Sequence, residues 1–252
     1  MTSVETKRLF APDAPIRRIF GESILLLGGG RALLMQLAHP SVAKGVAEHS
    51  NYKVEPLARL QRTIEAMNTI VFGSEDDALR TAAGLRAVHE RVRGPGYFAS
   101  DPALLFWVHA TLVDTALRMH ARFLRPVRGE ELERFYDETK TLAEVLGVPW
   151  GEQPADASAF RSYVRSMVAT LEVSDEARDV ARIVTSPRVP TPTQPVALLA
   201  RQLTTGLLPD PLRRGYGLRW DLARQAAFDA ACLATRQWLP RLPAQLRGGY
   251  PA

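Results

Sequence analysis

The sequence predicts an all-α protein, folded as a single globular helical domain. Three observations favour this fold class. Helix-forming Ala, Leu, Arg and Glu are abundant, and prolines and glycines fall mostly between the apolar segments. Alternating runs of β-branched residues are scarce, which argues against the α/β alternative. No repeat or shift in composition divides the 252 residues, so one large domain is expected.

The N-terminal part is expected to hold an extension over residues 1–18 and a first helix over residues 19–38. The helix prediction follows from a long apolar segment that has the glycine run 28–30 as a weak point. Pro40 should end this helix, because a proline disfavours helical geometry in the residue before it. A loop is expected over residues 49–52.

Caps and helix breakers define the other helices. Pro56 opens a predicted helix over residues 57–72, and Ser74, followed by three acidic residues, begins the next, which should run to residue 93. The remaining helices are predicted over residues 102–124, 129–146, 156–171, 174–184, 194–206 and 218–238. The proline-rich stretch 187–192 is expected to be an extended connector.

Composition excludes several classes of function. The net charge is +5, from 32 basic and 27 acidic residues, but no block of like charges is present, which argues against binding to nucleic acid. A single cysteine, Cys232, excludes a disulfide framework and indicates a small buried side chain. We find no apolar signal segment near the N-terminus and no stretch long enough to span a bilayer, so a cytoplasmic setting is expected.

His89 is the most informative residue, because helical spacing places it on an apolar stripe with Leu85, Val88 and Val92. An imidazole there must be hydrogen-bonded, metal-bound or strained. His109 presents the same choice on its own helix. For both, a core histidine bonded to a backbone carbonyl is the more common outcome. The five histidines show no zinc or di-iron spacing, whereas a haem needs only one axial imidazole.

Arg59 and Thr63 lie four residues apart, on one face of a predicted helix. A buried pair of this kind can clamp a carboxylate or a haem propionate. Alternatively, Arg59 covers the helix surface with its aliphatic stem. The glycine run 28–30 does not follow a strand and lacks the lysine of a phosphate-binding loop, and no serine nucleophile motif is present.

Several segments together resemble the oxygenase family that unites the fungal MpaB-type oxygenases with the bacterial latex-clearing rubber oxygenases. No single motif is very specific, but their order and spacing are, and the resemblance runs from about Gly21 to Tyr250. The segments are Gln36–Ala43 with His49 and Ser50, Arg59–Thr63 with Val71–Gly73, His89–Gly94, Asp101–Leu112, Glu138 with Leu146–Pro149, Leu207–Pro209, Leu212–Leu218 and Pro240–Pro243.

The resemblance implies globin-like helix packing around a central cavity that holds haem b. It implies that His89 is the iron ligand, from a His-x-x-Val-Arg pattern, and that Arg59, Arg62 and Thr63 bind the cofactor, with Arg59 and Thr63 also catalytic. Arg62 stands where the family has a pocket lysine, and arginine is a poor iron ligand. We find no match for the distal glutamate of the rubber oxygenases.

The resemblance therefore predicts a haem-dependent oxygenase that uses O2 on a small apolar, unsaturated substrate, such as an isoprenoid or a lipid. The sequence leaves two alternatives open. One is a helical protein that binds haem or a small ligand without turnover. The other is a structural helical protein whose histidines are ordinary core residues. The oligomeric state is not predicted.

Overall fold

Helices joined by turns and loops make up the described chain, with one short β-hairpin as its only strands, so the prediction of an all-α fold is confirmed. The computed structural model describes residues 7–49, 56–185 and 194–241, without the side chains of residues 56–60, 184, 195, 196 and 240. The expected connector over residues 187–192, and all but the first residue of the expected loop over residues 49–52, lie outside the described residues.

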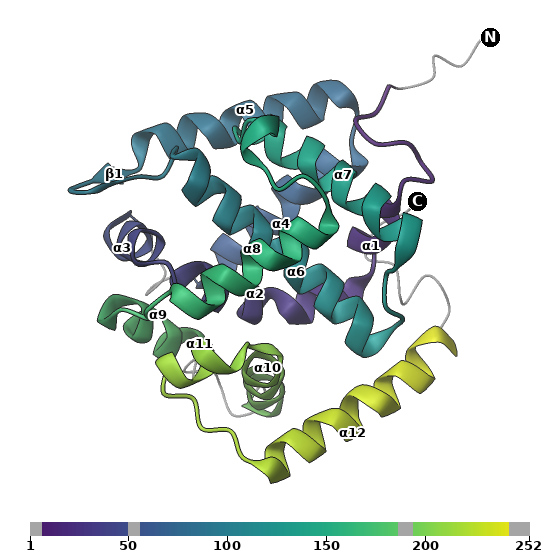
Figure 1. Cartoon of the computed structure of the whole chain (residues 1–252), viewed down its shortest axis with the longest axis vertical. Coiled ribbons are helices and arrows are strands. Elements are labelled where there is room, and N and C mark those ends of the chain that lie inside the picture. Colours follow the sequence, from purple (N-terminus) through teal and green to yellow (C-terminus); the bar gives the residue numbers. More distant parts are fainter. Residues whose placement is uncertain (1–6, 50–55, 186–193, 242–252) are drawn as a thin grey trace.

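The elements follow one another along the described chain in the order shown in Figure 1. The α-helices are α1 Pro15–Phe20, α2 Gly29–Leu37, α3 Pro40–His49, α4 Pro56–Phe72, α5 Glu75–Arg91, α6 Pro102–Phe123, α7 Gly129–Val145, α8 Ala157–Thr170, α9 Asp175–Thr185, α10 Gln194–Leu207, α11 Asp210–Gly215 and α12 Leu222–Trp238. Short 3-10 turns are η1 Ser23–Gly28, η2 Trp150–Glu152 and η4 Leu239–Arg241, and the hairpin strands are β1 Arg93–Gly94 and β2 Tyr97–Phe98.

Local capping explains where several helices begin. The Ser74 hydroxyl accepts a hydrogen bond from the backbone nitrogen of Asp77 at 3.2 Å, which confirms the predicted start of α5. Asp101, Asp156 and Asp221 cap α6, α8 and α12 in the same way. These side chains satisfy backbone donors that have no partner in the first turn of a helix.

The predicted helix over residues 19–38 is wrong, because the chain divides there into α1, η1 and α2. The break coincides with a close packing contact. A Cβ atom on Gly28 would lie 2.7 Å from the Thr115 methyl group, so a larger residue there would force α6 or its side chains to shift. Glycine also has a weak preference for helix. Two further helices, α3 and α11, were not predicted, and α5 ends at Arg91 instead of residue 93 because the hairpin begins there.

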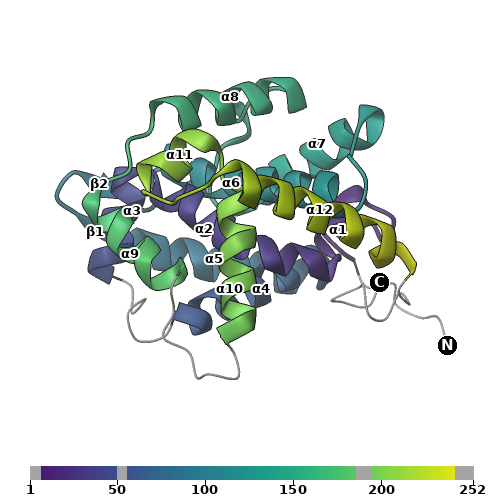
Figure 2. The same cartoon turned by 90° about the horizontal axis from the view of Figure 1, so that it is seen from below.

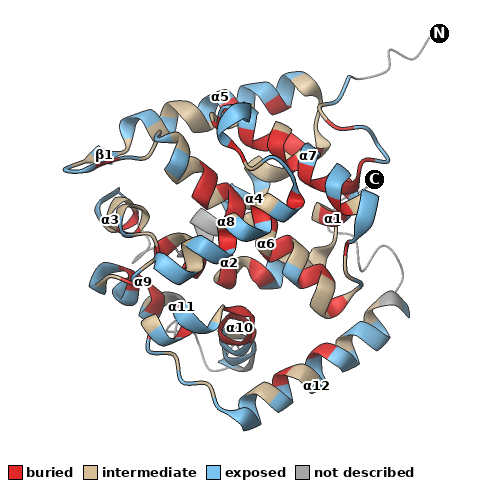
Figure 3. Cartoon of the chain, in the orientation of Figure 1, coloured by how far each residue is buried: buried red, intermediate tan, exposed pale blue. Residues whose placement is uncertain are grey.

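α6 runs through the middle of the described structure and packs against α1, α2, α7, α8 and α12 (Figure 1). Its residues Trp107, Ala110 and Val113 are fully buried, and Figure 3 shows buried positions along much of this helix. The middle of the described structure is thus occupied by a helix. The globin-like arrangement around a central cavity remains an expectation from the family resemblance.

A second apolar cluster joins α12 to the rest of the molecule. Phe228 and Cys232 of α12 pack with Leu203 and Leu207 of α10 and with Met119 of α6, so Cys232 is buried as predicted. α12 lies on the outside and crosses α10 (Figure 2). Most of its other residues are exposed.

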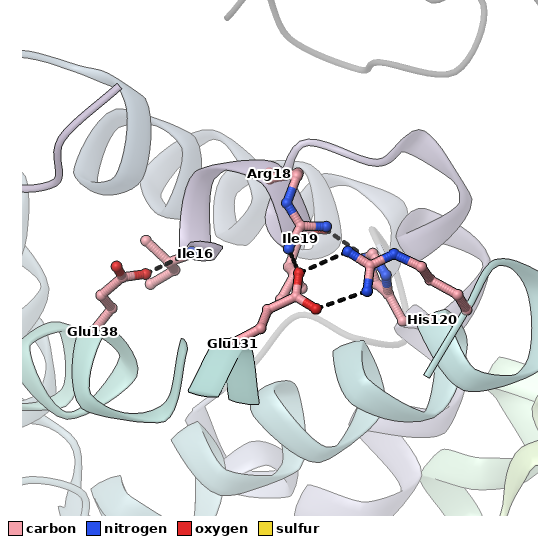
Figure 4. A network of polar contacts seen from close by, with 7 residues as sticks. Ile16, Arg18, Ile19, His120, Glu131 and Glu138 are labelled. Carbon is pink, nitrogen blue, oxygen red and sulfur yellow. Dashed lines mark hydrogen bonds and ion pairs between the residues drawn. The ribbon is translucent and has the colours of Figure 1, made fainter. Parts of the chain in front are cut away.

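Polar contacts fix α1 against α6 and α7, as Figure 4 shows. The Glu138 carboxylate of α7 accepts a hydrogen bond of 2.7 Å from the backbone nitrogen of Ile16 at the start of α1. Glu131 pairs with Arg18 of α1 and, through both carboxylate oxygens, with Arg125. These bonds hold the α1 end of the fold in place, and they lie apart from the candidate site on α5.

No helix in the described part of the chain is both long and apolar enough to cross a membrane. The longest is α6, which carries Asp114, Arg118 and Arg122 in its second half.

Candidate functional site

The candidate site lies on the helical hairpin formed by α4 and α5. Only Gly73 and Ser74 separate the two helices, which pack against each other. Arg59 lies near the beginning of α4 and His89 near the end of α5. Since both helices rise about 1.5 Å per residue, these two positions fall at the same level, at the end of the hairpin away from the connection. The backbone thus brings the two predicted positions to one end of the hairpin.

His89 is half-buried, and its Nδ1 atom is shielded from solvent. Its carbonyl accepts a hydrogen bond from the backbone nitrogen of Val92 at 3.1 Å, which closes the last turn of α5. Leu85 packs against the main core. Val88, however, is 50% exposed, so the predicted apolar stripe is wrong at that position.

The other predicted residues occupy α4. Arg62 and Thr63 are both exposed on this helix, so Thr63 does not supply the buried half of the Arg59–Thr63 clamp that the spacing suggested. The side chain of Arg59 lies outside the described residues.

His109 and His120, both on α6, are core residues. His109 is buried and hydrogen-bonds to the backbone of Thr139, and burial lowers the pKa of its imidazole to about 4. The Nε2 atom of His120 lies 3.3 Å from the Ile19 carbonyl, and burial likewise lowers its pKa to about 4 (Figure 4). Both imidazoles are therefore neutral at pH 7. They fill the structural role that the sequence left open for His109.

His39 and His49 lie at the two ends of α3. His39 is half-buried, and burial lowers the pKa of its ring, while the nearby Asp101 carboxylate opposes that change. His49 is exposed, with its Nε2 atom 4.0 Å from a Glu48 carboxylate oxygen and its ring against the edge of Tyr97. Sequence reasoning did not single out Glu48 or Tyr97, since 49 residues separate these two hydrogen-bonded partners.

Two hollows of about 270 and 320 Å³ lie elsewhere, between the N-terminal segment and α7. Arg134 borders both, and none of the predicted site residues lines either. They therefore give no support to the candidate site on α5.

A comparison with models of protein families shows which family the chain belongs to. Residues 17–237 match the model described as the catalytic domain of the ER-bound oxygenase mpaB/B′ and rubber oxygenase. The chain belongs to this oxygenase family. Neither the curated proteins nor the solved structures give a significant match to the chain. The resemblance inferred from the motifs is thus confirmed.

Rubber oxygenases in general depend on haem iron, so the described residues can be tested for their fit to that group. Within the described residues, no cluster of three or more His, Cys, Asp or Glu side chains could hold a metal ion. A haem needs less, namely one imidazole, an apolar surface and cations near its propionates. His89 supplies a half-buried imidazole with a shielded nitrogen, and Arg62 lies on the neighbouring helix. The hairpin thus supplies one imidazole and one cation of the kinds that a haem requires, and no group of several metal ligands is found among the described residues.

Proposed function

We propose that this protein is a haem b-dependent oxygenase that uses O2 on an apolar substrate with a C=C bond, such as an isoprenoid or an unsaturated lipid. One observation carries the proposal. In a chain that belongs to an oxygenase family, His89 lies half-buried, with a shielded ring nitrogen, on the hairpin that also holds the family's Arg-x-x-x-Thr positions. His109 and His120 lie on a different helix, α6, and bond to backbone carbonyls in the core.

His89 is the proposed iron ligand. It would bind as the neutral imidazole, and a hydrogen bond at its second ring nitrogen would fix the tautomer. Arg59 and Arg62 are proposed to hold the propionates by charge-assisted hydrogen bonds, and Thr63 adds a hydroxyl donor. Arg62 stays charged and does not replace the family's lysine as an iron ligand.

A bound haem b supplies the iron that activates O2, and the protein supplies binding, orientation and the exclusion of water. Leu85 on α5 and Met67 on α4 pack against the main core from this hairpin. A hydrocarbon substrate would need apolar side chains of this kind around it, to keep water from the reacting carbons.

The first test is the absorption spectrum of protein produced in haem-supplemented cells, with the haem content measured as the pyridine haemochrome. We expect a Soret band with about one haem per chain in the wild type, as one axial ligand implies. His89→Ala should lose the band, because it removes that ligand. His109→Gln is the matched control, since it changes a core histidine but keeps a donor for the Thr139 carbonyl.

The outcomes separate the alternatives. A folded His89→Ala protein with the wild-type spectrum and haem content would sink the assignment of His89. Haem that depends on His89, without O2 consumption on squalene or a polyisoprene oligomer, would indicate a haem-binding protein without turnover on these substrates. A wild-type protein that is fully folded but colourless would contradict the proposed haem-dependent activity. The family relationship would then be evidence for the fold alone.

A further inference from the structure

The β-hairpin that follows α5 is joined directly to the turn that carries His89. The Val92 nitrogen donates to the His89 carbonyl, and the Val92 carbonyl accepts from the Ala99 nitrogen at 2.9 Å. Between these bonds, β1 and β2 pair antiparallel, with Gly94 opposite Tyr97. The backbone of the hairpin and that of His89 therefore form one hydrogen-bonded unit.

Tyr97 fastens this unit to α3. Its ring is buried with 4% exposure, and its hydroxyl donates to a Glu48 carboxylate oxygen at 2.6 Å. A hydrogen bond of this length to an ionised carboxylate is among the stronger ones in proteins. The Lys44 ammonium of α3 adds a bond of 3.0 Å to the Pro95 carbonyl at the hairpin tip.

Two glycines leave room for the Tyr97 ring between the hairpin and α3. A Cβ atom on Gly94 would lie 2.6 Å from the Tyr97 ring and 2.9 Å from the Glu48 carboxylate. A Cβ atom on Gly45 of α3 would lie 3.2 Å from the same ring. The backbone on both sides of the contact is thus shaped to take the aromatic ring.

The contact between Tyr97 and Glu48 joins the end of α3 to the hairpin that follows the end of α5. α5 ends two residues after His89, and α3 ends at His49, from which the chain continues to α4. Glu48 lies in the last turn of α3 and Tyr97 in β2, so the Tyr97–Glu48 bond ties the end of α3 to the hairpin that follows α5.

We propose that Tyr97 and Glu48 are positioning residues for His89. Their hydrogen bond fixes the end of α5 and, through it, the direction in which the His89 imidazole faces. This role rests on the proposed function, in which His89 binds the haem iron. Neither residue touches the cofactor in this proposal, and both act through the backbone of residues 89–99.

The test compares Tyr97→Phe with Tyr136→Phe in protein loaded with haemin. Tyr136 is an equally buried tyrosine on α7, whose hydroxyl donates to the Pro154 carbonyl at 2.8 Å. Loss of the Tyr97 bond should speed haemin transfer to apomyoglobin by about tenfold, since a bond to a charged group contributes enough for such a change. It should also shift the Soret band and the electron paramagnetic resonance of the ferric haem, whereas Tyr136→Phe should leave both unchanged.

Variants of Glu48 test the same bond from the other side. Glu48→Gln keeps an acceptor oxygen but removes the charge, so it should give a smaller change than Tyr97→Phe, whereas Glu48→Leu should behave like Tyr97→Phe. Folded Tyr97→Phe protein with wild-type haemin transfer and spectra would overturn the proposal.

A separate measurement distinguishes this result from failure of the proposed function. If the wild type does not bind haemin through His89, the nitrogen-15 resonances of the His89 ring are recorded in the protein without haemin. A shift in Tyr97→Phe and none in Tyr136→Phe would support the positioning role alone. Unchanged His89 resonances in both variants would refute it.

Discussion

Arg31 and His109 are buried polar side chains with different partners. Arg31 is 2% exposed and donates to the Leu207 carbonyl at 2.9 Å, the Thr115 hydroxyl at 2.6 Å and the Asp114 carboxylate at 2.5 Å. His109 remains neutral and bonds to a backbone group. In both cases a polar group leaves water only because its hydrogen bonds are replaced.

The Arg31 contacts predict a large effect of substitution. Arg31→Ala should lower the free energy of unfolding by about 3–5 kcal/mol, because it leaves the Asp114 charge and two acceptors without their donor. Urea unfolding monitored by circular dichroism measures this. Arg80→Ala is the control, since Arg80 pairs with Asp77 on the surface and should leave the midpoint nearly unchanged. Equal midpoints for both variants would contradict the argument.

Individual residues show which parts of the site could be predicted from the sequence. Spacing alone treated His89 and His109 as similar candidates, and only the family resemblance separated them. The structure separates them physically, because His109 is buried against Thr139, a partner 30 residues away on α7. Glu48 and Tyr97 went unnoticed for the same reason, since a contact between distant segments leaves no periodic signal in the sequence.

At the level of the elements, local signals predicted helices well where caps and breakers are strong. Ser74 and Gly73 mark the junction of α4 and α5 correctly. The prediction of one long helix over residues 19–38 failed near Gly28, which packs close to α6 in a tertiary contact that no local signal reveals. Helix propensity gives a weak prior that such contacts override.

Close helix contacts also predict opposite effects for two glycine substitutions. In Gly206→Ala, the new Cβ atom would lie 2.7 Å from the Phe228 ring and 2.8 Å from the Trp220 ring, where α10 meets α12. We expect a loss of about 1–3 kcal/mol in the free energy of unfolding. Gly84→Ala meets nothing within 4 Å on α5 and should stabilise the protein by up to about 1 kcal/mol. Thermal unfolding of both variants checks the signs, and destabilisation by Gly84→Ala would refute the open space at that position.

For the whole molecule, the fold class and the family followed from the sequence, whereas the arrangement of the helices did not. Composition and helix breakers are local properties and indicated an all-α chain. The position of α6 in the middle and of α12 on the outside depends on which apolar faces meet, as with Phe228 of α12 and Leu203 of α10. Several helices carry similar apolar faces, so patterning alone does not pair them.

Burial of two neutral histidines predicts that the whole molecule loses stability in mild acid. The folded protein holds the pKa values of His109 and His120 at about 4, whereas both titrate near 6.5 in the unfolded chain. Below pH 6.5 the unfolded state therefore binds protons that the folded state does not bind. The free energy of unfolding should therefore be highest above pH 6.5. It should fall as the pH drops toward 4, by about 3 kcal/mol for each histidine.

Other groups modify this curve only in part. Burial raises the pKa of Glu138, which works in the opposite direction because the folded state then holds that proton more tightly. Urea unfolding at pH 7, 6, 5 and 4.5 measures the curve. His120→Gln should flatten it, since glutamine does not titrate, whereas a change at an exposed histidine, His49→Gln, should leave its slope nearly unchanged. If the slope between pH 6.5 and 4.5 is the same in His120→Gln as in the wild type, His120 does not drive the loss, and the acid sensitivity must come from His109 or from the half-buried His39, whose pKa burial also lowers.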